Sequence, residues 1–145
     1  MKKRIALLVL VFSFTFSFAQ KDAIVGEWYT HDKEAVVTIF LEGEKISGKT
    51  TWMKESLDDK GNPKLDKLNP NEELRGRKRL GLKIMQDFIY KGDNIWEDGR
   101  IYKPDNGKTY GGTATLIDNN TLSLKGYVIG FSFIGKSSTW TRKID

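Results

Sequence analysis

The sequence contains no cysteine and only one histidine, His31, among its 145 residues. Without thiols the chain can form neither a disulfide nor a cysteine-based nucleophile or metal site. His31 stands beside Asp32 in an expected turn, and no Gly-x-Ser-x-Gly sequence marks a serine nucleophile. We therefore predict no catalytic residues, no metal and no cofactor. A weak hydrolase that depends on His31 is the minority alternative.

Long apolar runs are also scarce, and the one that exists lies at the N-terminus. Residues 1–4 carry three positive charges, residues 5–18 are mostly apolar, and a small-x-small triplet ends at Ala19. This pattern predicts a signal peptide over residues 1–19, because the run is shorter than the roughly 20 residues that a membrane-spanning helix needs. We expect an exported protein, periplasmic or secreted and soluble, with no transmembrane segment after cleavage. It is not expected to be a lipoprotein, since no cysteine is available for lipid attachment.

Cleavage would leave residues 20–145 as a single domain and would lower the formal charge from +5 to +2 by removing Lys2, Lys3 and Arg4. We therefore expect no nucleic-acid partner. A domain of this size buries about two-thirds of the surface of its unfolded chain, so its core can hold it together without disulfides.

Short segments rich in β-branched and aromatic residues alternate with Gly, Asn and Asp, a pattern typical of antiparallel hairpins. The sequence predicts an all-β fold, a small antiparallel up-and-down β-barrel. Gly48 is expected to mark a bulge or bend. Residues 83–90 fit strand and helical spacing equally, so both remain open. The other expected strands cover residues 24–30, 35–41, 45–52, 94–102, 109–117, 121–129 and 137–143.

One long loop is expected over residues 53–79, which contain two of the three prolines and no Phe, Trp or Tyr. Burial alone cannot offset the entropy of ordering such a segment, and loops of this length are usually either functional lids or disordered. The basic run 75–79 stands where the loop returns to the barrel. It is either a solvated run or a clamp for a phosphate, a lipid head group or an acidic partner.

Gly26-x-Trp28 near the start and Trp140-x-Arg142 near the end resemble the closure of lipocalins and fatty-acid-binding proteins, the calycin superfamily. In that superfamily the Trp packs over the closed end of the barrel beneath the C-terminal Arg. An indole and a guanidinium stacked across the first and last strands supply cation–π and hydrogen-bond contacts. The resemblance implies a lipocalin-like barrel whose structural seam comprises Gly26, Trp28, Trp140 and Arg142.

A narrower set of motifs covers nearly the whole expected mature chain. They are Gly26-Glu27-Trp28, Gly48-Lys49, Asp66-x-x-Asn69-Pro70, Leu74-Arg75-x-Arg77, Leu80-Gly81-Leu82, the stretch from Trp96 to Tyr110, Leu124-x-Gly126-Tyr127, Gly135-Lys136 and Trp140-x-Arg142. In order and spacing they are similar to an uncharacterised family of exported bacterial proteins, domain of unknown function twenty-one forty-seven. The resemblance implies a small β-barrel in the cell envelope without an established activity. Lys125 departs from the family pattern, which usually has Arg there.

Strand alternation places Trp96, Asp98, Arg100 and Tyr102 on one face of the expected strand 94–102. If that face points into the barrel, it could orient the acidic head of an amphipathic ligand. If it points outward, Asp98 and Arg100 form a solvated pair and the aromatic residues pack across strands. The predicted ligand-binding residues are Trp96, Arg100, Tyr102, Tyr110 and Tyr127.

These observations favour a small exported barrel that binds a hydrophobic or amphipathic small molecule in the cell envelope. The alternative is a non-enzymatic module whose barrel is filled by side chains and whose long loop or basic run docks an envelope protein. The sequence does not distinguish a hollow barrel from a filled one.

Overall fold

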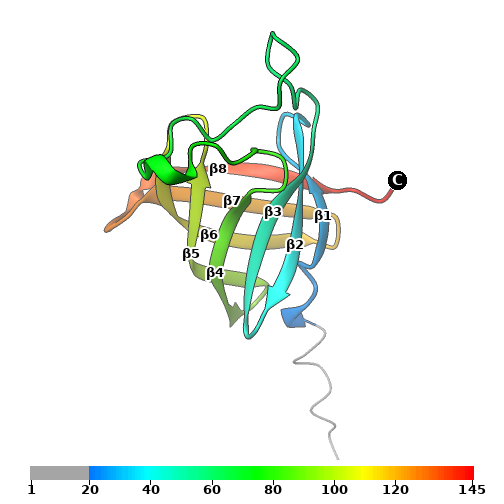
Figure 1. The fold of residues 1–145 in the computed structure, drawn as a ribbon. Helices are drawn as coiled ribbons and strands as arrows, with labels where there is room; N and C mark the ends of the chain where they lie inside the picture. Colours follow the sequence, from blue (N-terminus) through cyan, green and yellow to red (C-terminus); the bar gives the residue numbers. More distant parts are fainter. Residues whose placement is uncertain (1–19) are drawn as a thin grey trace, which may run out of the picture.

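The computed structural model describes residues 20–145, so the predicted signal peptide lies outside the described residues. Eight antiparallel strands form one closed barrel in which each strand pairs with its neighbours in sequence and the last pairs with the first (Figure 1). The strands are β1 (Gly26–Tyr29), β2 (Ala35–Glu42), β3 (Lys45–Met53), β4 (Lys83–Gly92), β5 (Ile95–Lys103), β6 (Lys108–Asp118), β7 (Thr121–Val128) and β8 (Phe131–Arg142). The predicted all-β barrel is confirmed.

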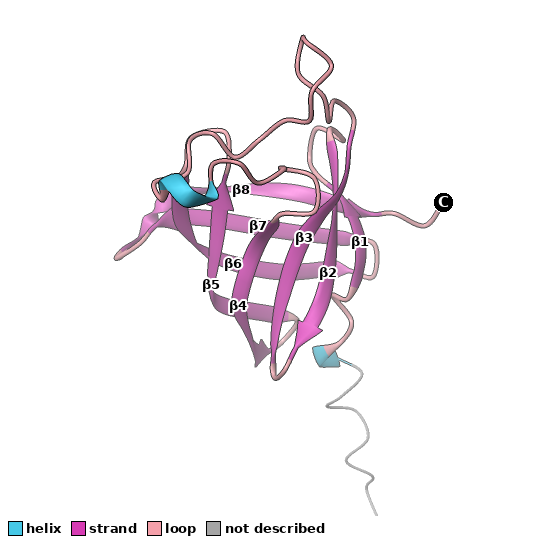
Figure 2. Ribbon diagram, in the orientation of Figure 1, coloured by secondary structure: helices cyan, strands magenta, loops and turns pink. Residues whose placement is uncertain are grey.

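The barrel wall consists of strands, and a short 3-10 helix, η1 (Glu72–Leu74), lies in the long loop (Figure 2). The segment that fitted both strand and helix is strand β4, which pairs with β3 and with β5. Strand β8 begins six residues earlier than predicted. Within residues 20–145, no helix has the length and apolar character that crossing a bilayer would require.

The barrel interior is filled by apolar side chains. Trp28, Trp96 and Phe88 are wholly buried there. A Cβ atom added at Gly99 or at Gly112 would lie 2.3 Å or 2.5 Å from the Phe88 ring. These glycines therefore leave the space that the ring occupies, and the barrel is filled at this level. The other buried members of the core are Ile24, Val37, Ile39, Ile46, Met85, Ile101, Ala114, Leu116, Leu122, Leu124 and Trp140.

Gly48 on β3 lies at a register shift in the pairing with β4, as its position in the sequence predicted. A Cβ atom there would lie 3.0 Å from the Met85 sulfur and 3.1 Å from a Val37 methyl group. The missing side chain thus lets β4 approach β3 closely at a point where the wall bends.

The up-and-down topology sorts the connections into two groups, one at each end of the barrel. The end that carries the turns after β2, β4 and β6, together with the entry into β1, is called the seam end. The other end carries the turns after β1, β5 and β7 and the long loop 54–82, and is called the loop end. In Figure 1 the long loop stands over this end, at the top of the barrel.

Candidate functional site

The seam end is closed by Arg142 of β8, which lies over Trp28 of β1 with its guanidinium carbon 4.3 Å from the ring centroid. The same guanidinium donates hydrogen bonds to three backbone carbonyls, those of Ala23 (2.6 Å), Val25 (2.9 Å) and Asn119 (2.6 Å). One side chain thereby ties together the entry to β1, the turn after β6 and the last strand. The predicted stacking of Arg142 on Trp28 is confirmed.

Gly26 and Trp140 complete this seam. Gly26 has a φ of 138°, and a Cβ atom there would lie 2.7 Å from Nη1 of Arg142, so a side chain would displace the guanidinium. Trp140 is buried in the core two residues before Arg142. Burial lowers the pKa of Arg142. The guanidinium of Arg142 and the indole N–H of Trp28 are thus both bound by carbonyl groups of the chain itself.

The predicted ligand face on β5 is divided by a β-bulge. Trp96 is paired with Ala114, but Gly99 is paired with Gly112, so β5 carries one extra residue between these pairs. Asp98 occupies the bulge with a φ of 60°. Trp96 and Gly99 both face the interior, and Arg100 and Tyr102 consequently face outward. The prediction that Trp96, Asp98, Arg100 and Tyr102 share a face is wrong for this reason.

The two remaining predicted residues also lie on opposite sides of the wall. Tyr110 is paired with Ile101, packs against the core and accepts a hydrogen bond from Asn106 (2.8 Å). The Tyr127 ring covers Gly111 on the outer face, where a Cβ atom would lie 2.2 Å from the ring. The five predicted residues therefore do not line a common site. The binding role of each stays a prediction.

Trp96 has one further property. Its indole Nε1 is buried and has no hydrogen-bond partner among the described residues. Buried indole N–H groups normally find an acceptor, so this group is an exception among the buried polar side-chain atoms of residues 20–145.

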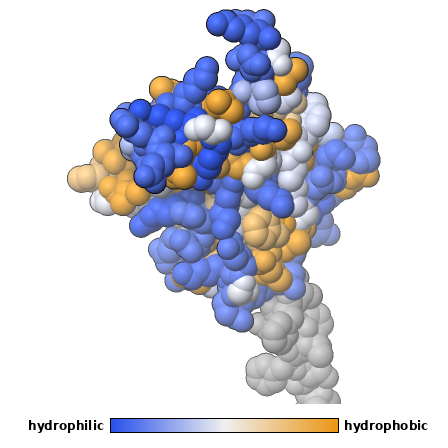
Figure 3. Space-filling model, in the orientation of Figure 1, coloured by the Kyte–Doolittle hydropathy of each residue, from blue (hydrophilic) through white to orange (hydrophobic). Residues whose placement is uncertain are grey.

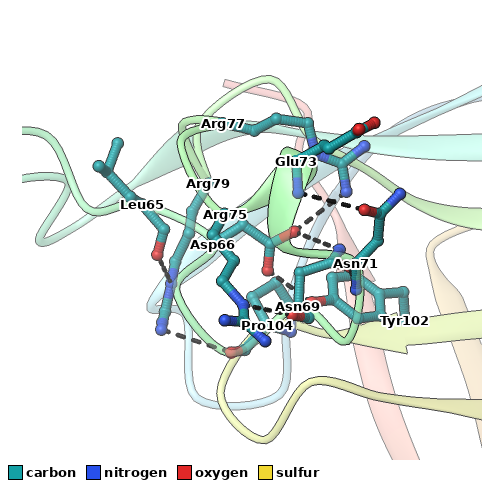
Figure 4. A network of polar contacts seen from close by, with 10 residues as sticks. All are labelled: Leu65, Asp66, Asn69, Asn71, Glu73, Arg75, Arg77, Arg79, Tyr102 and Pro104. Atoms are coloured by element: carbon teal, nitrogen blue, oxygen red, sulfur yellow. Dashed lines mark hydrogen bonds and ion pairs between the residues drawn. The ribbon is translucent and has the colours of Figure 1, made fainter.

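At the loop end, a buried carboxylate organises the long loop (Figure 4). Asp66 is 0% exposed and accepts three hydrogen bonds: from the Tyr102 hydroxyl (2.5 Å), the Asn69 amide (2.8 Å) and the Arg77 guanidinium (3.0 Å). Tyr102 belongs to β5, whereas the other two belong to the loop. The loop is thus attached to the outer face of the barrel through a polar centre.

The proton equilibria of this centre follow from its contacts. Burial tends to raise the pKa of Asp66, but the hydrogen bonds from Tyr102, Asn69 and Arg77 outweigh burial and hold the pKa below its usual value. Burial, together with the hydrogen bond to Asp66, raises the pKa of Tyr102 to about 12. At neutral pH the centre therefore pairs a carboxylate with a protonated phenol.

Arginines of the basic run hold the same loop. Arg75 donates to the backbone carbonyl of Asn69 (2.8 Å), and Arg79 donates to the carbonyl of Leu65 (3.1 Å) and to Asp105 beyond β5 (2.7 Å). The run was predicted to be either solvated or a clamp for a phosphate, a lipid head group or an acidic partner, but three of its four basic residues bind the chain itself. The set Asp66, Asn69, Arg75, Arg77, Arg79 and Tyr102 is called the loop network.

Backbone packing against the turn after β5 adds to this attachment. Gly107 has a φ of 69°, and a Cβ atom there would lie 1.9 Å from the carbonyl oxygen of Leu68. The position requires glycine both for its backbone angle and for the close approach of the loop. The loop 53–79 is therefore an ordered segment attached to the rim of the barrel, and its role as a functional lid stays a prediction.

A shallow depression of about 490 Å³ lies where the loop returns into β4. Its lining residues are Arg77, Lys78, Leu80, Gly81, Leu82 and Lys83. Arg77 is paired with Asp66, and Lys83 is paired with Glu42 (2.8 Å). Lys78 has no acidic partner within residues 20–145. The depression thus joins an unmatched cation to the side chains of Leu80 and Leu82.

None of the residues that line this depression was among the predicted ligand-binding residues. Its signal in the sequence was the basic run beside Leu80-Gly81-Leu82, a motif of the family resemblance to which no role was assigned. His31, by contrast, is exposed in the turn after β1, and residues 20–145 hold no cluster of three or more His, Asp and Glu side chains fit to bind a metal ion.

A closed eight-stranded antiparallel barrel sealed by a Trp–Arg pair is a lipocalin-like barrel. The family model described as "Uncharacterized protein conserved in bacteria (DUF2147)" matches residues 26–142, and the chain belongs to this family. A solved structure from Helicobacter pylori, entitled "Protein HP1028 from the human pathogen Helicobacter pylori belongs to the lipocalin family", is similar over 83% of each chain. The two are 28% identical, and their TM-score is 0.72. No curated protein sequence matches the chain.

Proposed function

We propose that the protein is a non-enzymatic binding protein of the cell envelope that takes an anionic amphipathic molecule at the loop end of the barrel. The observation that carries this proposal is the depression in which Lys78, Arg77 and Lys83 stand beside Leu80 and Leu82. Ammonium and guanidinium groups suit a carboxylate or phosphate head group, and the exposed side chain of Leu80 offers an apolar surface to an alkyl chain.

The packing of the interior supports a site on the rim rather than deep in the barrel. Phe88 occupies the space above Gly99 and Gly112, and Trp28 and Trp96 fill further parts of the core. A ligand of alkyl-chain length would have to displace these side chains in order to enter. At the rim, Leu80 is 43% exposed and can be covered without any such rearrangement.

The proposed location in the envelope rests on the N-terminal segment. Three basic residues, an apolar run and a small-x-small triplet over residues 1–19 have the order of a cleaved export signal. The similarity to a protein described as a lipocalin supports small-molecule binding as the class of function.

The proposal is tested with dodecyl phosphate and laurate as probes and dodecanol as the uncharged control. Isothermal titration calorimetry and the shift in melting temperature should show binding of the two anions and much weaker binding of the alcohol. Lys78→Glu and Leu80→Asp should each weaken binding by roughly tenfold or more. Lys60→Glu and Leu57→Asp, at exposed loop positions outside the depression, are the matched controls and should leave binding unchanged.

Three results would contradict the proposal: no heat and no stabilisation with either anion, equal affinity for dodecanol, or binding that is unaffected by Lys78→Glu and Leu80→Asp. Mass spectrometry of material extracted from the protein purified from its native host adds an independent check, since a co-purifying anionic lipid is expected.

A protein-interaction module is the second candidate, and the filled interior favours it because such a barrel needs no small ligand. The ordered loop 54–82 would then be the docking element. Proximity labelling in the envelope should identify a partner that is lost when residues 58–73 are deleted. That outcome, combined with absent binding of both anionic probes, would select this candidate over the first.

A further inference from the structure

The hairpin formed by the end of β7 and the start of β8 is apolar and exposed. Phe133 is 80% exposed, and four other apolar residues of the hairpin, Val128, Ile129, Phe131 and Ile134, are exposed as well. In Figure 1 this hairpin projects beyond the barrel wall, and at the same edge of Figure 3 hydrophobic residues gather. Contiguous exposed apolar patches of this kind mark interaction sites in folded proteins.

The apolar surface belongs to the projecting hairpin itself and is not part of the outer face of the barrel wall. Pairing passes from Tyr127 with Gly135 directly to Val128 with Phe131, so residues 132–134 bulge out of the ladder. The rings of Phe131 and Phe133 lie edge to face with their centroids 6.0 Å apart. Residues 131–137 of β8 are all exposed, so the side chains of this part of β8 reach solvent on both faces of the ribbon. A two-stranded ribbon that is exposed in this way gains little stability from packing against the barrel core.

The charged residues in the sequence on both sides of the hairpin are of one sign. No Asp or Glu occurs between residues 119 and 144, while Lys125 and Lys136 stand just behind the apolar tip. Lys125 is paired with Ser137 and Lys136 is paired with Gly126, so the two lysines belong to adjacent pairs and point to opposite faces of the ribbon. A surface that contacts this hairpin head-on meets apolar side chains first and a cation on each side next.

The distance between the apolar tip and the two lysines is similar to the thickness of the interfacial region of a lipid bilayer. The Gly126–Lys136 pair lies three residues behind Ile129 at the turn, about 10 Å at roughly 3.3 Å per residue. Interfacial protein segments bury their apolar groups about 5–10 Å into the boundary between head groups and acyl chains. With the tip at this depth, both lysine side chains reach the level of the lipid phosphates.

We propose that the tip of the β7–β8 hairpin docks the protein on an anionic lipid bilayer, with Phe131, Phe133 and Ile134 inserted among the head groups. Charge complementarity selects this occupant: Lys125 and Lys136, in a stretch of sequence (residues 119–144) that contains no acid, suit phosphate-rich lipid surfaces. The hairpin and the depression at Lys78 involve different residues, so this docking does not depend on the proposed ligand.

The test uses the protein that begins at Gln20, which contains the whole closed barrel, so that the apolar N-terminal segment cannot itself bind lipid. Sedimentation with vesicles of phosphatidylglycerol and phosphatidylcholine should carry down the protein, and pure phosphatidylcholine vesicles should carry down far less. The double variant Phe131→Ser and Phe133→Ser should reduce binding by roughly tenfold or more. Ile117→Ser is the matched control because Ile117 is 62% exposed on β6 and should have no effect.

The charge layer is tested separately. Lys125→Gln and Lys136→Gln should each reduce binding to anionic vesicles by about fivefold and leave the weak binding to neutral vesicles unchanged. Because the chain has no cysteine, Phe133→Cys provides a unique position for a polarity-sensitive fluorophore. Its emission should shift to the blue on addition of anionic vesicles, whereas a label at Ile117→Cys should not respond.

Several outcomes would overturn the proposal. One is the absence of binding to anionic vesicles by a folded protein. Another is binding that the double Phe variant retains in full, which would assign the contact to another basic surface. A third is a dimer, observed by light scattering, that Phe133→Ser dissociates, since the hairpin would then be an interface between copies of this chain. Circular dichroism and melting curves establish that each variant is folded.

Discussion

The two ends of the barrel are both held by arginine side chains, but the groups that these arginines contact are opposite in character. At the seam end, Arg142 stacks on a buried indole and donates to backbone carbonyls at the edge of the apolar core. At the loop end, Arg77 meets the buried carboxylate of Asp66, and the loop itself contributes little to the apolar core. The first arrangement closes the fold, whereas the second attaches a cover to a barrel that is already closed.

The two ends therefore differ in what they contribute: the seam end stabilises the fold, and the proposed binding surfaces lie elsewhere. Damage at the seam end should lower the stability of the whole barrel, because the seam joins β1 to β8 and packs on the main core. Damage at the loop end should release the loop and alter the depression beside it, while the barrel remains. Both surfaces proposed to bind other molecules, the depression and the β7–β8 hairpin, lie away from the seam.

The largest effect is expected from Trp28→Ala. The substitution removes a wholly buried indole and the surface on which Arg142 stacks, and it should lower the free energy of unfolding by about 3–5 kcal/mol. Urea denaturation followed by circular dichroism measures this change. His31→Ala, at an exposed position three residues later, is the control and should change stability by less than about 0.5 kcal/mol. Equal losses in the two variants would contradict the role of the seam.

Asp66→Ala should have the next largest effect, about 1–3 kcal/mol, because it leaves three donors without their acceptor. The estimate stays below the cost of breaking a fully buried ion pair, since Arg77 is 41% exposed and water can replace its partner. Limited proteolysis should show faster cleavage within the loop. Asp59→Ala, an exposed loop position, is the matched control. Resistance of the Asp66→Ala loop to protease would count against the loop network.

A pair of glycines tests the backbone contact at the loop end. Gly43 and Gly107 have similar positive φ angles, 65° and 69°, but only Gly107 lies against the loop, at the carbonyl of Leu68. Gly107→Ala should therefore destabilise the protein by about 1 kcal/mol more than Gly43→Ala, which carries the backbone strain alone. Thermal melts of the two variants measure the difference. Equal costs would mean that the loop does not press on this turn.

The smallest effect at neutral pH is expected from Tyr102→Phe, whose influence should grow in alkali. The pKa of Tyr102 is raised to about 12 from 10.0, so the stability contributed by its protonated form is present below pH 10 and is lost as the pH rises toward 12. The wild-type loop should become sensitive to proteolysis over this interval. In Tyr102→Phe that pH dependence should be absent. An unchanged alkaline transition in the variant would assign the transition to another group.

The seam was predictable from the sequence because it uses uncommon residue types at fixed places near the two ends of the chain. Gly26-x-Trp28 and Arg142 are its central residues, and the structure shows them in contact. The hairpins were predictable for a similar reason, since Gly and Asn stand at their turns. The number of strands followed from those turns, apart from the ambiguous segment that became β4.

The ligand face on β5 could not be predicted because it depends on a single backbone angle. Alternation assumes regular strand geometry, and the φ of 60° at Asp98 inserts a residue that reverses the faces beyond it. Asp tolerates a positive φ better than most residues, but Asp98-Gly99 alone does not distinguish a bulge from an ordinary strand position. The start of β8 was missed because residues 131–136 are exposed, and the alternation of Phe131, Ser132 and Phe133 ends after three residues.

The loop network could not be predicted for a different reason: its residues are far apart along the chain. Tyr102 contacts Asp66 across 36 residues, and no local period connects a polar loop to a strand so far away. Asp66-x-x-Asn69 and Arg75-x-Arg77 did stand among the motifs of the family resemblance. Their roles emerge only when the fold brings the carboxylate and its donors together.

Hydrogen–deuterium exchange of the wild type, Asp66→Ala and Trp28→Ala tests most directly the claim that one end closes the fold and the other attaches a cover. In Asp66→Ala, faster exchange should be confined to residues 54–82 and the adjoining turn at Gly107, and the strands should keep wild-type protection. In Trp28→Ala, exchange should accelerate across all eight strands. Faster exchange throughout the barrel in Asp66→Ala, or an effect confined to β1 and β8 in Trp28→Ala, would contradict the account.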